Sequence, residues 1–309
     1  MMPVNQSSML EDNFQYSLGP PDSGFSLFLA ERTKKVHFIR HAEGFHNVET
    51  TKTGTTECLE RGANQATEHP LWDSRLTEKG IEQAQALKGH LERRPSGGRS
   101  FTAFDLVVVS PLTRTLETAQ HIFGPARKPG MPAFMFKGEA PPPRILVREE
   151  CRERWGKYVC DGRRPMREII PEFPLFDFSE VEYDEDVFFT QDEREPEAHT
   201  CARAVQFLEW LNKRPEKCIA VVTHSSFLRH LFMQFGADKS TSDKDTIQRL
   251  AGNCELRSVV MCSHGVKDAR TLKPMTPHAA NSTVTMATDG GGRSGAGADG
   301  GSVLGNAPP

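Results

Sequence analysis

The chain has 309 residues and a net charge of −3, which allows one large domain or two ordinary ones and indicates no surface for nucleic acid or for a membrane. No apolar run approaches the ~18 residues of a membrane-spanning helix, and the N-terminus lacks the basic and apolar stretches of a secretory signal. The seven cysteines form no Cys-x-x-Cys pair, which argues against a zinc knuckle or a thioredoxin-like motif. We therefore expect a reducing, cytoplasmic location.

Composition divides the chain into three segments. Residues 1–33 mix serine, proline, glycine and acidic residues without periodicity, and they are interpreted as an N-terminal extension. Residues 271–309 contain a glycine-rich stretch that cannot bury apolar surface, so a flexible tail is expected there. Residues 34–270 are predicted to form a single domain.

Strands and helices are predicted to alternate within this domain. The first element is a strand at Lys35–Arg40. A helix begins near Leu76, because Thr77 can serve as its N-cap. Its buried stripe is predicted to contain Ile81, Ala84, Leu87 and Leu91.

The middle of the domain opens with a continuous apolar run, Phe104–Val109, which is typical of a parallel strand covered on both faces. Ser110 is predicted to cap the helix that follows, with Pro111 at its first position, where the missing N–H costs nothing. Pro125–Pro143 is rich in proline and glycine and is predicted to be a loop.

The last third begins with Phe173–Glu197, which has little periodicity and is expected to be an irregular insertion lying over the site. A helix is predicted at Ala198–Asn212, where Cys201, Val205, Leu208 and Leu211 recur at helical spacing. A buried strand at Cys218–Val222 precedes a helix through Phe227, Leu228, Leu231 and Phe232. The alternation implies an α/β fold, a three-layer sandwich with a mostly parallel sheet flanked by helices.

Three polar motifs follow directly after the predicted strands. They are Arg40-His41-Ala42-Glu43, Ser110-Pro111-Leu112-Thr113-Arg114 and Thr223-His224-Ser225-Ser226. Because such sheets bind ligands at the carboxyl ends of their strands, we expect the arginines and histidines of these motifs to meet. Arginine donates paired hydrogen bonds to phosphate oxygens, and a neutral histidine can attack phosphorus. The motifs therefore predict a phosphoryl-transfer site built from Arg40, His41, Arg114 and His224.

Further short patterns accompany these motifs. They are Asn47 six positions after His41, Asp73-Ser74-Arg75-Leu76-Thr77-x-x-Gly80, Ser110-Pro111-x-x-Arg114-Thr115 and Val222-Thr223-His224. Together they resemble the histidine phosphatase superfamily, the phosphoglycerate mutase-like group, from about residue 35 to about residue 235. The stretch Cys151-Arg152-Glu153-Arg154-Trp155-Gly156, followed by Cys160-Asp161-Gly162-Arg163-Arg164-Pro165, is similar to the fungal and plant phosphoglycerate mutase-like phosphatases.

The resemblance implies a phosphoglycerate mutase-like fold and a phosphohistidine mechanism. His41 would attack the phosphate ester and become phosphorylated. The groups that would hold the phosphoryl oxygens are Arg40, Arg114 and His224, with Asn47 adding a hydrogen bond.

An acidic side chain must protonate the leaving alkoxide, and a carboxylate must later activate water. By its position in the motif Glu153 is the predicted acid, and Glu149 and Glu150 are the alternatives. The Arg163-Arg164 pair would either bind a second anionic group of the substrate or form a solvated basic turn.

We therefore predict a metal-independent phosphomonoesterase that acts on a small phosphorylated metabolite without a cofactor. The alternatives are a bisphosphoglycerate-dependent phosphoglycerate mutase and a non-catalytic phosphate-binding scaffold. Mutases typically carry an Asn-Glu-Arg-His-Tyr-Gly-like segment where this chain has Arg152–Gly156, which favours hydrolysis. A metal site built on His37, His41 and His46 is disfavoured, because His37 lies within the predicted strand and no carboxylate has suitable spacing.

Overall fold

A computed structural model describes residues 29–60, 66–92, 104–124, 143–235 and 241–263. The predicted tail, most of the predicted N-terminal extension and nearly all of the predicted loop at Pro125–Pro143 lie outside the described residues. The strands run between Thr33 and Cys262. The domain limits at residues 34 and 270 stay a prediction.

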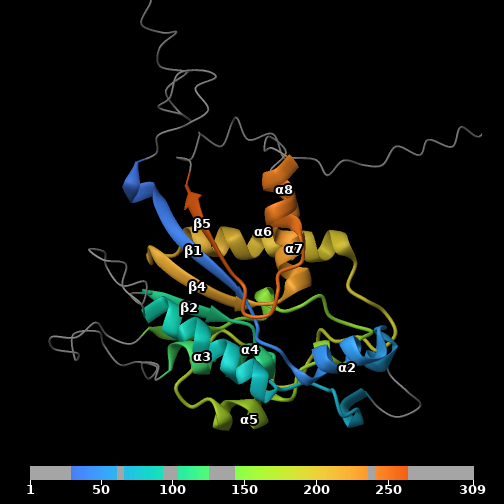
Figure 1. Ribbon diagram of the computed structural model, residues 1–309. Coiled ribbons are helices and arrows are strands. Elements are labelled where there is room, and N and C mark those ends of the chain that lie inside the picture. The colour runs from blue at the N-terminus through green and yellow to red at the C-terminus, as the bar shows by residue number, and fades with distance from the viewer. Residues whose placement is uncertain (1–28, 61–65, 93–103, 125–142, 236–240, 264–309) are drawn as a thin grey trace, which may run out of the picture. The chain divides into compact units, whose positions relative to one another are not determined.

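A five-stranded sheet lies at the centre of the described part (Figure 1). Its strand order is β3-β2-β4-β1-β5, in which β5 is antiparallel to β1 and the other neighbours are parallel. The strands are β1 (Thr33–Arg40), β2 (Leu106–Val109), β3 (Arg144–Val147), β4 (Cys218–Thr223) and β5 (Leu256–Cys262). The three strands predicted from the sequence are confirmed with small shifts in their limits, whereas β3 and β5 were not predicted.

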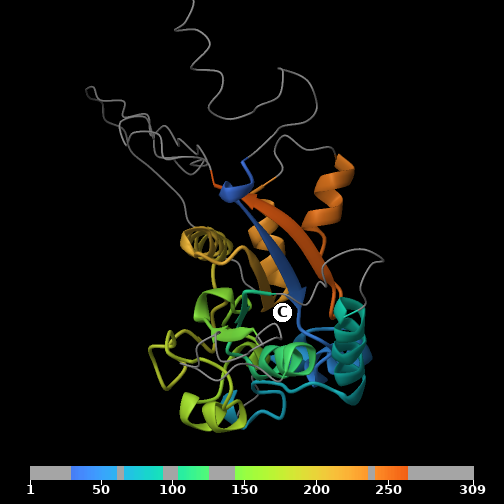
Figure 2. The ribbon, with the colours of Figure 1, turned by 90° about the vertical axis from the view of Figure 1, so that its left-hand side faces the viewer.

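Helices cover both faces of the sheet (Figures 1 and 2). On one face α3 (Glu78–Glu92) and α4 (Thr113–Phe123) pack against Val107 and Val109, and on the other α6 (Glu197–Lys213) and α7 (Ser225–Met233) pack against Val108. Successive strand residues point to opposite faces, so a strand covered on both sides is apolar throughout. The predicted three-layer α/β fold is confirmed.

The remaining α-helices of the described part are α2 (Phe45–Thr53), α5 (Met166–Ile169) and α8 (Thr241–Gln248).

No helix within the described ranges is both long enough and apolar enough to cross a membrane.

Helix α3 begins where the sequence predicts. The hydroxyl of Thr77 accepts a hydrogen bond from the backbone N–H of Gly80 at 3.0 Å, which is the bond of an N-cap residue. The predicted stripe is confirmed, because its four residues either are buried in the core or pack against it: Ala84, Leu91, Ile81 and Leu87.

Helix α4 does not begin at Ser110, so that prediction was wrong. The first helical residue is Thr113, whose backbone N–H and hydroxyl donate to the carboxylate of Asp73 at 2.8 and 2.6 Å. Asp73 lies 40 residues earlier in the chain, so a local pattern cannot reveal this cap. Ser110 is instead hydrogen-bonded to the imidazole of His224.

Helix α6 is confirmed, but its buried face differs from the apolar residues that recur at helical spacing. Val205 is 37% exposed, and Cys201 and Leu208 are only partly buried. The guanidinium of Arg203 donates to the carboxylate of Glu195 and to three backbone carbonyls, and this turns a charged residue toward the core. The buried residues of this helix are Thr200, Arg203, Ala204, Phe207 and Leu211.

The predicted insertion is irregular, since no helix or strand occurs between Phe173 and Pro196. Its later part is joined to the segment after β3, because the backbone N–H of Glu195 donates to the carbonyl of Trp155 at 2.9 Å. The insertion therefore packs beside the residues that carry the predicted proton donor.

Gly80 is a position in α3 where a side chain has no room. A Cβ there would lie 2.1 Å from the carbonyl oxygen of Glu43, so we expect Gly80→Ala to lower the free energy of unfolding by about 1–3 kcal/mol. The matched control is Gly89→Ala in the same helix, where a Cβ would have no neighbour within 4 Å. The control should raise the free energy of unfolding by about 0.5–1 kcal/mol. Urea titration measures both changes, and a stabilising effect of Gly80→Ala would contradict the close contact.

Candidate active site

His41 lies one residue beyond β1 and is only 2% exposed. Its backbone N–H donates to the carbonyl of Thr223 at 2.9 Å, so the ladder between β1 and β4 continues to this residue. Its imidazole Nδ1 lies 2.7 Å from the carbonyl oxygen of Ala42. Because a carbonyl only accepts, Nδ1 carries the proton of the neutral ring and Nε2 keeps the lone pair. His41 is therefore held as the tautomer in which Nε2 can act as a nucleophile.

Two further imidazoles surround His41. The ring centroids of His224 and His46 lie 5.2 and 5.3 Å from that of His41, and all three residues are buried. Burial, followed by the positive charge of Arg114, holds the pKa of each imidazole well below its usual value. The three rings are accordingly neutral at pH 7.

His224 follows β4 and occupies the N-cap position of α7. Its Nε2 is hydrogen-bonded to the hydroxyl of Ser110 at 2.8 Å, and its Nδ1 is buried without a partner among the described residues. The backbone N–H of Ser110 donates to the carbonyl of Val222 at 3.1 Å, so the strands themselves align the two residues. The structure thus brings the motifs after β2 and β4 to the same edge of the sheet as His41.

The charges of Arg40 and Arg114 act on all three imidazoles. Nη1 of Arg40 donates to the carbonyl of Ala251 at 2.8 Å, and Arg114 donates to the carbonyl of Cys160 and, at 3.0 Å, to the carboxylate of Asp161. The Nε of each arginine is buried without a partner among the described residues. An unpaired buried donor costs about 1–3 kcal/mol, and phosphate oxygens are acceptors of the kind that arginine N–H groups bind.

Asn47 lies in the first turn of α2. Its amide oxygen accepts from the backbone N–H of Gly44 at 3.1 Å and from the amide of Asn253 at 3.2 Å. Asn253 also donates to the carbonyl of His41 at 3.2 Å, which links Asn47 to His41. Because the oxygen of Asn47 is occupied, its NH2 group is the part that can donate to a ligand.

Glu153 is the carboxylate that the structure brings to the site. It is 8% exposed and lies against the first turn of α7, where its oxygens accept backbone N–H groups from Phe227 at 2.9 Å and Ser226 at 3.1 Å. A third bond comes from the backbone N–H of Arg154 at 2.9 Å. The helix N-terminus thereby fixes the carboxylate two to three residues after His224.

The two alternative acids are engaged elsewhere. Glu149 is paired with the buried guanidinium groups of Arg152 and Arg163. Glu150 is paired with Arg148. The geometry therefore favours Glu153 over both.

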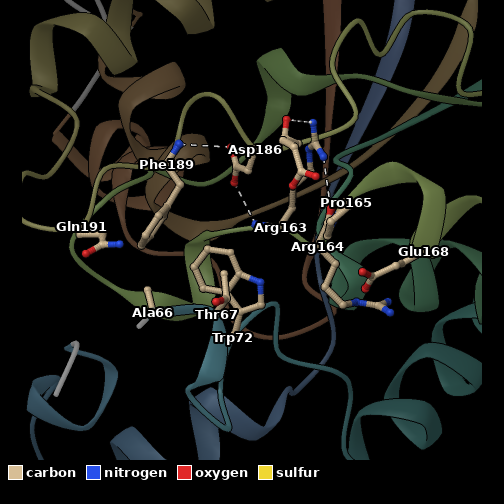
Figure 3. A pocket seen from close by; sticks show the side chains of 11 residues that line it. Ala66, Thr67, Trp72, Arg163, Arg164, Pro165, Glu168, Asp186, Phe189 and Gln191 are labelled. Carbon is tan, nitrogen blue, oxygen red and sulfur yellow. Dashed lines mark hydrogen bonds between the residues drawn. The ribbon is translucent and has the colours of Figure 1, made fainter. Parts of the chain in front are cut away.

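Arg163 and Arg164 do not form a free anion-binding pair. Arg163 is fully buried and its five donors are occupied by Glu149 and by four backbone carbonyls, so both of its predicted roles are wrong. Arg164 is 21% exposed and pairs with Asp73 and Glu172. Figure 3 shows the two arginines in the wall of a cavity of about 500 Å³, where their charges are already compensated.

Of the three side chains weighed for a metal site, His41 and His46 are neighbours, whereas His37 is engaged with other residues. His37 is hydrogen-bonded to the hydroxyl of Ser258 at 2.7 Å and lies edge-on to Phe104. Across the described ranges, no three His, Cys, Asp or Glu side chains are arranged to hold a metal ion. All seven cysteines are free thiols.

His46 and Asn253 were not assigned to the phosphate site from the sequence. His46 directly precedes Asn47, and a helix predicted to begin at Phe45 would have placed both residues in one turn beside His41. Asn253 has no such local signal, because it reaches the site from the loop before β5.

Comparisons with known proteins show the family of this chain. Residues 36–131 match the model of the histidine phosphatase superfamily (branch 1). A phosphoglycerate mutase-like protein of Arabidopsis thaliana is 34% identical over 257 residues, covering 79% of this chain and 90% of the relative. Phosphoglycerate mutase-like protein 2 of the same plant is 36% identical over 274 residues, covering 76% of each chain. A probable phosphatase of Schizosaccharomyces pombe is 26% identical over 213 residues, covering 68% of this chain and 82% of the relative.

The chain belongs to the histidine phosphatase superfamily, and the plant and fungal relatives confirm the predicted resemblance to its phosphoglycerate mutase-like group.

Because the three imidazoles are buried and neutral, we predict that acid destabilises the protein. Their pKa values lie below the ~6.5 of an unfolded chain, so the unfolded state binds more protons and stability falls as the pH drops below about 6.5. Each imidazole contributes at most about 1.4 kcal/mol per pH unit. We expect His46→Phe to reduce the slope of the free energy of unfolding against pH. Urea unfolding in phosphate-free buffer between about pH 7.5 and 5 measures this slope.

The control for this slope is His90→Phe, at an exposed position of α3. If His46→Phe and His90→Phe showed the same pH dependence as the unmodified protein, His46 would not be a neutral buried group.

Proposed function

We propose that the protein is a metal-independent phosphomonoesterase that hydrolyses a small phosphorylated metabolite through a phosphohistidine on His41. The observation that supports this most is the state of His41, which is neutral and donates from Nδ1 to Ala42, leaving Nε2 as the nucleophile. Arg40 and Arg114 lie beside it and suit a substrate that is an anion. A neutral nucleophile next to fixed cations can attack an ester that those cations hold and polarise.

In the first step Nε2 of His41 attacks phosphorus, a P–N bond forms and the bond to the leaving oxygen breaks. The phosphoryl oxygens are stabilised by the guanidinium groups of Arg40 and Arg114 and by donors from Asn47 and His224. The carbonyl of Ala42 accepts from Nδ1–H throughout, and it stabilises the positive charge that develops on the imidazole.

Glu153 is proposed as the acid that protonates the leaving oxygen. Its three backbone N–H donors hold both carboxylate oxygens in place beside His224. In the second step the same carboxylate removes a proton from the water that attacks the phosphohistidine. The P–N bond then breaks, inorganic phosphate leaves and His41 is restored.

The mutase alternative uses the same residues but returns the phosphoryl group to a substrate. Two observations favour hydrolysis: the mutase-type segment is replaced by Arg152–Gly156, and a relative of this chain is named a probable phosphatase. Fold and site are shared by many activities, so the products of the reaction must decide.

We expect His41→Ala to reduce the hydrolysis of an aryl phosphate by at least about 10³-fold, because the proposed covalent intermediate forms on this imidazole. Acid-labile phosphate on the unmodified protein after rapid quenching, and its loss in His41→Ala, would identify the intermediate. His90→Ala, on the exposed face of α3, is the control and should retain full activity.

Substantial turnover by His41→Ala would reject His41 as the nucleophile.

Activity that resists chelators is also expected. Interconversion of phosphoglycerates without release of phosphate would support the mutase, and binding of phosphate without turnover would support a scaffold.

We expect Glu153→Gln to show a dependence on the leaving group. The rate at which an alkyl phosphate phosphorylates His41, measured by rapid quenching, should fall by about 10²–10⁴-fold, because a poor leaving group needs the proton. The same step with a nitrophenyl phosphate, measured as the burst of nitrophenolate, should slow far less, because nitrophenolate leaves without a proton. Glu150→Gln is the matched control, and an equal slowing of this first step with both substrates would argue against Glu153 as the acid.

A further inference from the structure

Asp161 is a buried carboxylate that binds two guanidinium groups. Its Oδ1 accepts from Nη2 of Arg114 and its Oδ2 accepts from Nη1 of Arg194, both at 3.0 Å. The side chains of Asp161 and Arg114 are 4% and 1% exposed, so water screens their interaction little. Asp161 therefore influences both the orientation of Arg114 and the charge that Arg114 presents to a ligand.

Arg114, Asp161 and Arg194 together carry a net charge, whereas a neighbouring network of ion pairs is neutral. In that network Arg152 and Arg163 share the carboxylates of Glu149 and Asp186, so the charges cancel. In the set formed by Arg114, Asp161 and Arg194, two guanidinium groups share one carboxylate, which leaves one net positive charge. Without the second arginine the buried pair would be neutral and would attract an anion weakly.

Arg194 is held firmly in this position. Its Nη1 also donates to the carbonyl of Gly156 at 3.0 Å, and its guanidinium lies 4.2 Å from the centre of the Tyr158 ring. Burial alone would lower the pKa of Arg194, but the charges of Asp161 and Glu153 raise it, so the side chain stays cationic. The irregular insertion thus places a fixed cation behind the phosphate-binding arginine.

We propose that Arg194 is a positioning residue for the phosphoryl site: it compensates the charge of Asp161, so that Arg114 is anchored and still acts as a net cation. This inference rests on the proposed function, in which Arg114 holds the phosphoryl group. Arg194 itself does not touch the substrate in this role. Its charge matters, and its size does not.

The experiment measures the affinity for inorganic phosphate, by calorimetry and by competitive inhibition of aryl phosphate hydrolysis. Arg194→Met keeps the aliphatic stem and removes the charge, so phosphate affinity should fall about tenfold. Arg194→Lys keeps the charge but loses the planar fork over Tyr158, so it should recover part of the affinity and bind phosphate at least about threefold more tightly than Arg194→Met. Arg167→Met removes a guanidinium that is 58% exposed on α5, and this control should change the affinity less than about twofold.

A double variant separates charge from packing. Asp161→Asn keeps an oxygen that accepts from Arg114 but removes the negative charge. Combined with Arg194→Met it restores one net positive charge, so phosphate affinity should recover about tenfold to near the original value. If Arg194 acted only through its contacts, the double variant would bind phosphate more weakly than either single variant, because the effects of two lost contacts would add.

Three results would overturn the proposal. They are a double variant no tighter than Arg194→Met, an Arg194→Lys variant as weak as Arg194→Met, and an Arg194→Met variant that melts earlier but binds phosphate normally. If the unmodified protein bound no phosphate, the proposed function would fail as well. Normal phosphate binding by the unmodified protein without recovery in the double variant would refute only the role of Arg194.

Discussion

The register of the parallel strands β1, β4 and β2 is the constraint on which the site depends. The ladder continues beyond the strands, because His41 donates to the carbonyl of Thr223 and Ser110 donates to the carbonyl of Val222. Neighbouring strands lie about 4.8 Å apart, so residues that follow them directly end within one side chain of each other. The imidazoles of His41 and His224 consequently lie 5.2 Å apart. A slip of one residue would turn every side chain of the strand to the other face and separate the cluster.

Electrostatics within this cluster follows from burial. Three imidazoles stay neutral because they are buried and the guanidinium of Arg114 is near, whereas the guanidinium groups cannot lose their charge. The fold therefore places neutral imidazoles beside permanent cations. The surrounding carboxylates are held differently: Glu153 lies on the N-terminus of α7 just after His224, and Asp161 binds the guanidinium of Arg114. Each is held by donors from segments far apart in the chain.

Sequence patterns predicted the elements that are determined by residues close together in the chain. The cap at Thr77 and the apolar strands were found, because a hydroxyl near a helix start or an unbroken apolar run has one common explanation. The start of α4 and the buried face of α6 were not found, because Asp73 and Arg203 act through partners outside their own elements. Arg163 was misjudged for the same reason: charge indicates exposure, yet five acceptors from the surrounding segments bury it.

The sequence by itself determined which residues meet at one edge of the sheet. Arginine and histidine directly after apolar strands of an α/β protein lie where parallel strands end, and the predicted group of Arg40, His41, Arg114 and His224 needs no more than that rule. Only the tertiary structure decided the tautomer of His41, the contact of Glu153 with the first turn of α7 and the positions of His46, Asp161 and Arg194. These depend on single hydrogen bonds between segments that are distant in sequence, and no local pattern encodes such distances.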